Sequence, residues 1–201
     1  MSIAAAFGQK TRIENYVCYG SNRNGIGNST LVSLQNHSNW IIDMRYGYDA
    51  PRTFSLNFGK SFETGNNTIS SISTSTIGIA VGAINGINLN LEQEVELSRF
   101  YFSTKLQYFF SPRDKTDNFF YTWSELGICF SKKVFSGISF QGTVANNKCR
   151  DANKGFVIGF SRGRCTFPVY VFDPFNDGRS IVAGIFYNIK PQKPLMARVA
   201  N

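Results

Sequence analysis

Apolar and polar residues alternate along most of this sequence, and the alternation is clearest between residues 85 and 110. From 87 to 97, Ile, Leu and Val alternate with Asn and Glu, and from 100 to 110, Phe, Leu and Tyr alternate with largely polar residues. Only Ser98 and Arg99 separate the two runs. Two period-two runs joined by two residues are typical of a β-hairpin whose strands have one apolar and one polar face.

Similar runs continue from residue 11 to residue 189 and predict about twelve strands, or about ten if residues 68–83 pair differently. Helical apolar stripes are scarce and no apolar run is long enough for a transmembrane helix, so the predicted fold class is all-β. The predicted links fall into two groups. Long polar links follow odd-numbered strands, and short turns follow even-numbered ones: 21–28, 111–118, 145–154 and 173–180 are long, whereas 37–39, 98–99, 131–133 and 162–165 are short.

Long and short links at opposite ends of a sheet are typical of a transmembrane up-and-down barrel. The strands of 85–110 also exceed the ~5–6 residues usual in soluble sheets and match the ~9–11 of a tilted membrane strand. In this pattern the chain resembles bacterial outer-membrane β-barrel proteins over roughly residues 10–189, and Gly184, Tyr187 and Ile189 resemble the strand that closes such barrels. The resemblance implies an antiparallel, up-and-down transmembrane β-barrel in the bacterial outer membrane, in contact with the lipid bilayer and lipopolysaccharide.

The two faces of each strand then have different surroundings. The apolar face is expected to meet lipid, with Trp40, Tyr48, Tyr108 and Tyr187 near the membrane interfaces. The polar face is expected to line the lumen. The lumen-lining candidates are Asp43, Arg45, Asn88, Asn90, Glu92, Glu94, Glu96, Lys105, Gln107 and Gln141.

Turn lengths also predict which of these residues oppose each other. A turn at Ser98-Arg99 places Glu92 opposite Lys105, where opposite charges attract across strands, and a turn at 37–39 places Ser33 near Asp43. The carboxylates at 92, 94 and 96 would favour cations if the lumen conducts. An equally open interpretation is that these charges only fill the interior.

Charge and chemistry-bearing residues add little to this prediction. The 201 residues carry a net charge of +8, but Lys and Arg are spread over loops and turns without a recognition motif, so no nucleic-acid partner is expected. The single histidine, His37, lies in a predicted turn, and no catalytic, cofactor-binding or metal site is indicated. A non-enzymatic protein is therefore expected, with an outer-membrane lipid hydrolase as an open alternative. The pairing of Cys18, Cys129, Cys149 and Cys165 is left open by their spacing.

The ends of the chain differ from the barrel segment. Residues 1–9 resemble the last part of a signal peptide, and residues 190–201 are expected to form a flexible basic tail in the periplasm. The function expected for residues 10–189 is a narrow pore for passive transport with a polar, charged lumen. The alternatives are a non-catalytic structural or accessory barrel of an envelope complex, binding a protein through its loops or tail, and a soluble β-barrel that binds a lipophilic ligand.

Overall fold

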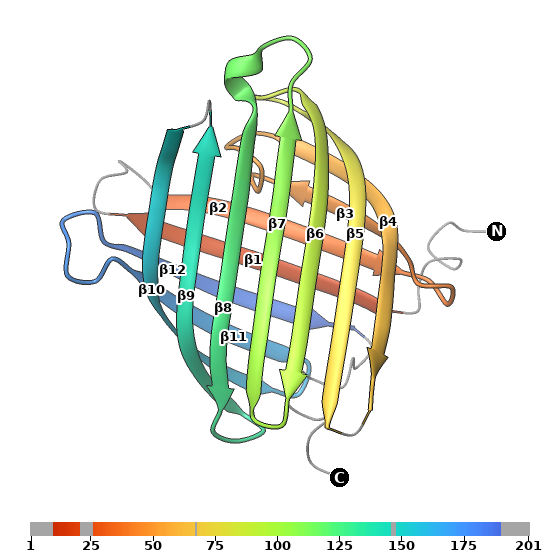
Figure 1. Ribbon diagram of the computed structural model, residues 1–201, viewed down its shortest axis with the longest axis vertical. Helices are drawn as coiled ribbons and strands as arrows, with labels where there is room; N and C mark the ends of the chain where they lie inside the picture. The colour runs from red at the N-terminus through yellow and green to blue at the C-terminus, as the bar shows by residue number, and fades with distance from the viewer. Residues whose placement is uncertain (1–9, 21–25, 67, 146–147, 190–201) are drawn as a thin grey trace.

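The computed structural model describes residues 10–20, 26–66, 68–145 and 148–189, and of residues 26 and 148–150 only the backbone. Within these ranges the chain forms one closed barrel of antiparallel strands (Figure 1). The strands are β1 Lys10–Gly20, β2 Ile26–Gln35, β3 Trp40–Tyr46, β4 Phe54–Gly65, β5 Ile69–Val81, β6 Gly86–Leu97, β7 Phe100–Phe110, β8 Phe119–Cys129, β9 Val134–Ala145, β10 Lys148–Arg162, β11 Cys165–Phe172 and β12 Ser180–Asn188.

The strands follow an up-and-down order. Each strand pairs with its neighbours in sequence, and β1 pairs with β12 to close the ring. In Figure 1 the strands of one wall cross those of the opposite wall obliquely, as expected when strands tilt relative to the barrel axis. The sequence therefore predicted the fold class and the strand number correctly, and residues 68–83 contribute the single strand β5.

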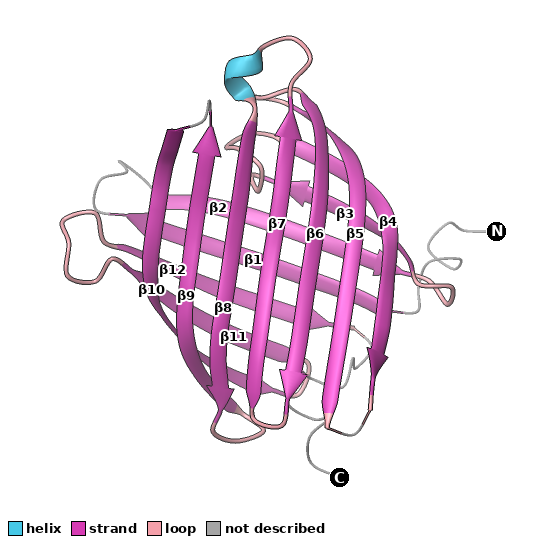
Figure 2. Ribbon diagram, viewed as in Figure 1, coloured by secondary structure: helices cyan, strands magenta, loops and turns pink. Residues whose placement is uncertain are grey.

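One short helix accompanies the strands in the described part of the chain (Figure 2). This 3-10 helix, η1 (Lys115–Asp117), lies in the link between β7 and β8, and the Asp114 side chain accepts a hydrogen bond from the Thr116 backbone N–H at its start. Among the described residues, no helix has the length and apolar character needed to cross a membrane.

The outer wall of the barrel is apolar. The outward positions of neighbouring strands carry exposed Leu, Ile, Val and Phe, including Leu56, Ile79, Leu91 and Leu126. An apolar band of this extent is rare on soluble monomers and is the lipid-facing surface of a membrane barrel, since its residues alternate with inward polar ones. Outward Gln93 and Thr104, which lie opposite each other, interrupt the band on β6 and β7.

Aromatic rings border this band near the short-turn end, the end that carries the turns 36–39 and 98–99. The rings of Trp40 and Phe58 stack at 4.9 Å, and Lys60 Nζ lies 5.5 Å from the centre of the Trp40 ring. Trp and Lys side chains combine an apolar body with a polar tip, which suits the boundary between acyl chains and headgroups. Tyr108 and Tyr187 are also exposed on the outer wall.

The observed register agrees with the register predicted from turn length. Ser33 lies opposite Asp43, Leu31 opposite Arg45, and Glu92 opposite Lys105. Register matters here because a slip of one residue would exchange the lipid-facing and inward-facing side chains of a whole strand.

Two of the predicted long links are wrong. Strand β2 already begins at Ile26, within the predicted loop 21–28, and β10 begins at Lys148, within the predicted loop 145–154. Residues 151–154 pair with residues 140–143 of β9, so this polar segment is part of the β9–β10 hairpin. Polar composition alone indicated a loop, but the ladder is formed by backbone N–H and C=O groups, so a polar segment can also pair as a strand. The predicted segments 1–9 and 190–201 lie outside the described residues.

Candidate functional site

The ten predicted lumen-lining residues all occupy inward positions, on β3, β6, β7 and β9. Buried among them are Asp43, Arg45, Asn88, Asn90, Glu92, Glu96 and Gln107, whereas Glu94, Lys105 and Gln141 are half-buried. They do not form one cluster. Gln141 lies apart from the others and donates a hydrogen bond to the Tyr121 hydroxyl at 2.7 Å.

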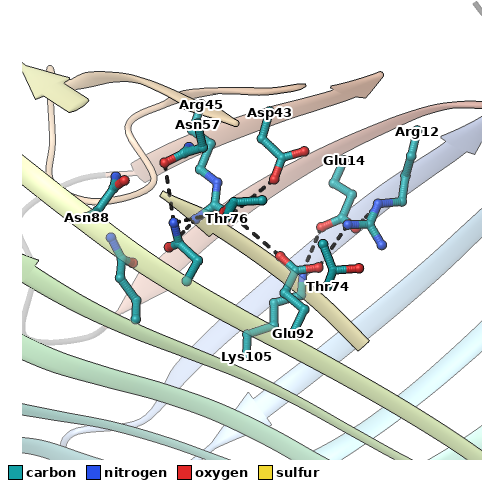
Figure 3. A network of polar contacts seen from close by, with 12 residues as sticks. Arg12, Glu14, Asp43, Arg45, Asn57, Thr74, Thr76, Asn88, Glu92 and Lys105 are labelled. Carbon is teal, nitrogen blue, oxygen red and sulfur yellow. Dashed lines mark hydrogen bonds and ion pairs between the residues drawn. The ribbon is translucent and has the colours of Figure 1, made fainter. Parts of the chain in front are cut away.

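Seven charged side chains meet in the interior, and we call them the charged network; Figure 3 labels all of them except Glu94. They extend from the inner faces of β1, β3, β6 and β7 toward one another. Each base lies within 3.6 Å of at least one carboxylate. The network consists of Arg12, Glu14, Asp43, Arg45, Glu92, Glu94 and Lys105.

Arg12 is the base with the most partners. Its Nη2 donates to Glu92 Oε2 at 3.0 Å, its Nε lies 3.2 Å from Glu14 Oε1, and its Nη1 lies 3.5 Å from Glu94 Oε1. The pair with Glu92 joins β1 to β6, which are not neighbours in the barrel. Arg12 therefore ties two separate parts of the wall together through the lumen.

The predicted ion pair between Lys105 and Glu92 is wrong. Lys105 lies opposite Glu92 in the ladder, yet its Nζ contacts Glu14 Oε2 at 2.9 Å on β1 rather than forming the predicted cross-strand pair. Glu92 instead lies between Arg12 and Arg45. The prediction considered only adjacent strands, but in a barrel this narrow a long side chain can reach a carboxylate on the opposite wall.

Arg45 is the most buried base, with 3% of its side chain exposed. Its Nη2 lies 3.4 Å from Asp43 Oδ2 and 3.6 Å from Glu92 Oε1, and its Nη1 donates to Asn90 Oδ1 at 2.9 Å. Asn90 in turn donates to Thr76 Oγ1 at 3.2 Å and to Asn57 Oδ1 at 3.3 Å. Amide and hydroxyl groups thus extend the network from β3 to β4, β5 and β6 and give several of the polar groups that the barrel buries a hydrogen-bond partner.

The link 47–53 contributes at the other end, which we call the long-loop end. Asp49 accepts a hydrogen bond from Gln107 at 2.6 Å and one from Asn88 at 3.4 Å. The Tyr48 ring lies 5.0 Å from the Arg45 guanidinium carbon. Tyr48 was expected in the outer aromatic girdle, but it follows the end of β3 at Tyr46, so the strand alternation no longer determines its direction.

The remaining side of the interior is filled by aromatic and aliphatic side chains, which we call the aromatic cluster: Tyr16, Tyr101, Trp123, Phe135, Val157, Tyr170, Phe172 and Val182. Trp123 packs against Tyr16 at 5.4 Å and against Tyr170 at 4.9 Å between ring centres. Tyr16 belongs to both halves, because its hydroxyl donates to Glu14 Oε2 at 3.0 Å. The interior is therefore divided into an aromatic side and a polar side.

Two small cavities lie on the polar side, one on each side of Glu92. The short-turn cavity has a volume of about 40 Å³ and is lined by Arg12, Glu92 and Glu94 among other residues. The long-loop cavity has a volume of about 10 Å³ and is lined by Arg45, Glu92 and Lys105 among others. A cavity needs roughly 10–15 Å³ to hold one water molecule, so both are of the size of one to a few waters. Glu92 and its partners separate them and form the constriction of this side.

Sequence reasoning missed three groups of this site. Arg12 and Glu14 alternate with apolar residues in β1, and that alternation was a usable signal for inward charge. The aromatic cluster gave no such signal, because Tyr16, Trp123 and Tyr170 are indistinguishable in type from outward aromatic residues. Asp49 lies in a link, outside the reach of strand periodicity. His37, by contrast, lies in the expected turn and is exposed.

Together, the closed ring, the apolar outer wall and the charged interior define a membrane-spanning β-barrel with a constricted polar core. Comparison with solved structures places its fold with that of outer-membrane porins. The KdgM porin superposes with a TM-score of 0.60 at 11% identity, covering 88% of this chain and 98% of the porin. The NanC porin gives 0.60 at 8% identity, covering 89% of this chain and 100% of the porin. KdgM in complex with disordered oligogalacturonate gives 0.59 at 10% identity. No family model and no curated protein matches the sequence.

Proposed function

We propose that this chain is a narrow outer-membrane channel for the passive transport of small polar solutes. The proposal rests on one observation: Glu92 lines both the short-turn cavity and the long-loop cavity. A route between the two ends of the barrel therefore passes Glu92, with the aromatic cluster filling the other side. The porin fold of the structural neighbours supports the same function.

The charged network closes this route in the present conformation. Arg12–Glu92 and Lys105–Glu14 are ion pairs between strands that are far apart around the ring, so a solute cannot pass without separating them. Arg12 and Lys105 keep 24% and 18% of their side chains exposed, so water reaches the bases, but Glu92 and Glu14 are buried, so separating either pair costs free energy. The proposed channel is therefore of small conductance, with brief openings when these pairs part.

Planar-bilayer recording tests the proposal. The purified, refolded chain is expected to give discrete current steps, and Glu92→Ser should enlarge them because it shortens the side chain that separates the two cavities. Glu125→Ser is the matched control. Glu125 is an inward carboxylate too, half-buried, but it accepts a hydrogen bond from Tyr170 at 2.9 Å on the aromatic side.

Folding must be established independently of conductance. Folded membrane barrels resist unboiled SDS and migrate anomalously on gels, so each variant is first compared with the parent in this way. Folded protein that gives silent bilayers at all voltages would contradict the channel and favour a structural role. Equal step sizes in Glu92→Ser and the parent would contradict the assigned route.

A further inference from the structure

The charge of the interior differs in sign from the charge of the chain. The chain carries a net charge of +8, yet the charged network holds four carboxylates and only three bases. Further carboxylates face the interior beyond the network: Glu96 continues the inward face of β6, and Glu125 faces inward from β8. Asp49 adds another at the long-loop end. The described interior is therefore acidic within a basic protein.

The bases of the network are already engaged by carboxylates. Arg12 contacts three of them, Arg45 contacts two, and Lys105 contacts Glu14. An anion entering the constriction would have to displace a carboxylate that is tethered to the wall. Glu92 and Glu94 line the short-turn cavity, and the two bases that also line it are both paired: Arg12 with these carboxylates and Lys10 with Glu63 at 3.5 Å. A cation entering this cavity therefore meets carboxylate oxygens.

Buried polar atoms without a hydrogen-bond partner among the described residues include both acceptors and donors. Asp43 is 2% exposed and Asn88 is fully buried, and Oδ1 of each has no hydrogen-bond partner among the described residues. Two donor atoms, Arg45 Nε and Asn57 Nδ2, are in the same position. These atoms favour neither sign of charge, because Arg45 and Asp43 both carry a full charge and are paired with each other at 3.4 Å.

Several basic residues outside the charged network lie far from the constriction. Arg99, Lys132 and Lys133 are in exposed turns at the short-turn end. Charges in water are screened over about 8 Å at physiological ionic strength, but charges in a narrow passage with low-dielectric walls are screened much less. Rings of Asp and Glu in such passages select cations.

We propose that the channel prefers cations to anions, with Glu92 and Glu94 as the selecting residues, so that its solutes are small cations and compact cationic organic molecules. The inference rests on the proposed channel function. It separates this chain from the neighbouring KdgM porin, whose structure was determined with oligogalacturonate, a polyanion. A shared porin fold does not determine the charge of the solute, because at 11% identity most residues of the two chains differ.

Reversal potentials across a KCl gradient test the inference. The parent protein is expected to reverse near the equilibrium potential of K⁺, with a several-fold higher permeability for K⁺ than for Cl⁻. Glu94→Gln should shift the reversal potential toward zero. Glu94→Lys should bring the reversal potential to zero or change its sign. Asp117→Asn removes the same charge from the link between β7 and β8 and should leave the reversal potential unchanged.

The outcomes distinguish a failure of the cation preference from a failure of the channel function. Open channels that reverse near the Cl⁻ equilibrium potential, or a Glu94→Lys variant that reverses like the parent, would overturn the cation preference and leave the channel function standing. Silent bilayers from folded protein would overturn the channel and the preference together. The same gel that establishes folding of the parent is used for each variant.

Discussion

Lys105 Nζ and Glu14 Oε2 lie 2.9 Å apart although β7 and β1 are six strands apart in either direction around the ring. The pair therefore bridges opposite walls of the barrel. A barrel of this strand number is between small filled barrels and open porins in size, and here side chains long enough to span it close the lumen.

Removing this bridge should enlarge the passage. Lys105→Ala is expected to raise single-channel conductance, because the truncated side chain no longer reaches β1 and Glu14 keeps Arg12 as a partner. Lys60→Ala on the outer wall, where Lys60 lies over the Trp40 ring, is the control and should conduct like the parent. Unchanged conductance in folded Lys105→Ala would show that this bridge does not limit the passage.

Arg45 should be important for stability as well as for shape. Arg45→Met leaves Asp43 and Glu92 buried without their shared base, and breaking a buried pair in this way costs about 3–5 kcal/mol. Urea unfolding in lipid vesicles measures the change in the free energy of unfolding. Arg99→Met, in an exposed turn, should change it by less than about 0.5 kcal/mol. Equal effects of the two substitutions would argue against a buried, paired Arg45.

The free-energy cost of a charged residue on the outer wall should depend on its depth in the membrane. Leu91 lies midway along β6 and Leu97 at its end, and both are exposed on the outer face. Leu91→Arg should destabilise the folded barrel by about 2–4 kcal/mol and Leu97→Arg by about 0–1 kcal/mol, because the cost of a charge falls toward the interface. Unfolding titrations in vesicles compare them. A larger cost at Leu97 than at Leu91 would contradict a membrane midplane near the middle of β6.

In the aromatic cluster, a second substitution should recover part of the stability that a first one removes. A Cβ at Gly159 would overlap the Phe135 ring, so Gly159→Ala should destabilise the barrel by about 1–3 kcal/mol through overpacking. Phe135→Leu in the same chain should recover part of that loss, because the shorter side chain leaves room. A double-mutant cycle of unfolding free energies measures the recovery, and strictly additive losses would contradict the contact.

Strand alternation predicted the fold well because it is a direct consequence of the two surroundings of a barrel wall. It identified β6 and β7, their register and the inward direction of Glu92. It did not predict which side chains meet across the lumen, as Lys105 and Glu14 show, because contacts between distant strands depend on barrel width and tilt. It also did not predict the aromatic side of the interior: Trp123 and Tyr170 satisfy the burial requirement of an inner face by packing on each other, which composition along one strand cannot indicate.

Whether residue 92 lies in the conducting path is tested most directly by charged thiol reagents during single-channel recording. Glu92→Cys, in a background with the four natural cysteines replaced by Ser, should lose most of its current when a charged methanethiosulfonate is added, and the background itself should not respond. An undiminished current, with the attached group detected on residue 92 by mass spectrometry, would contradict the account.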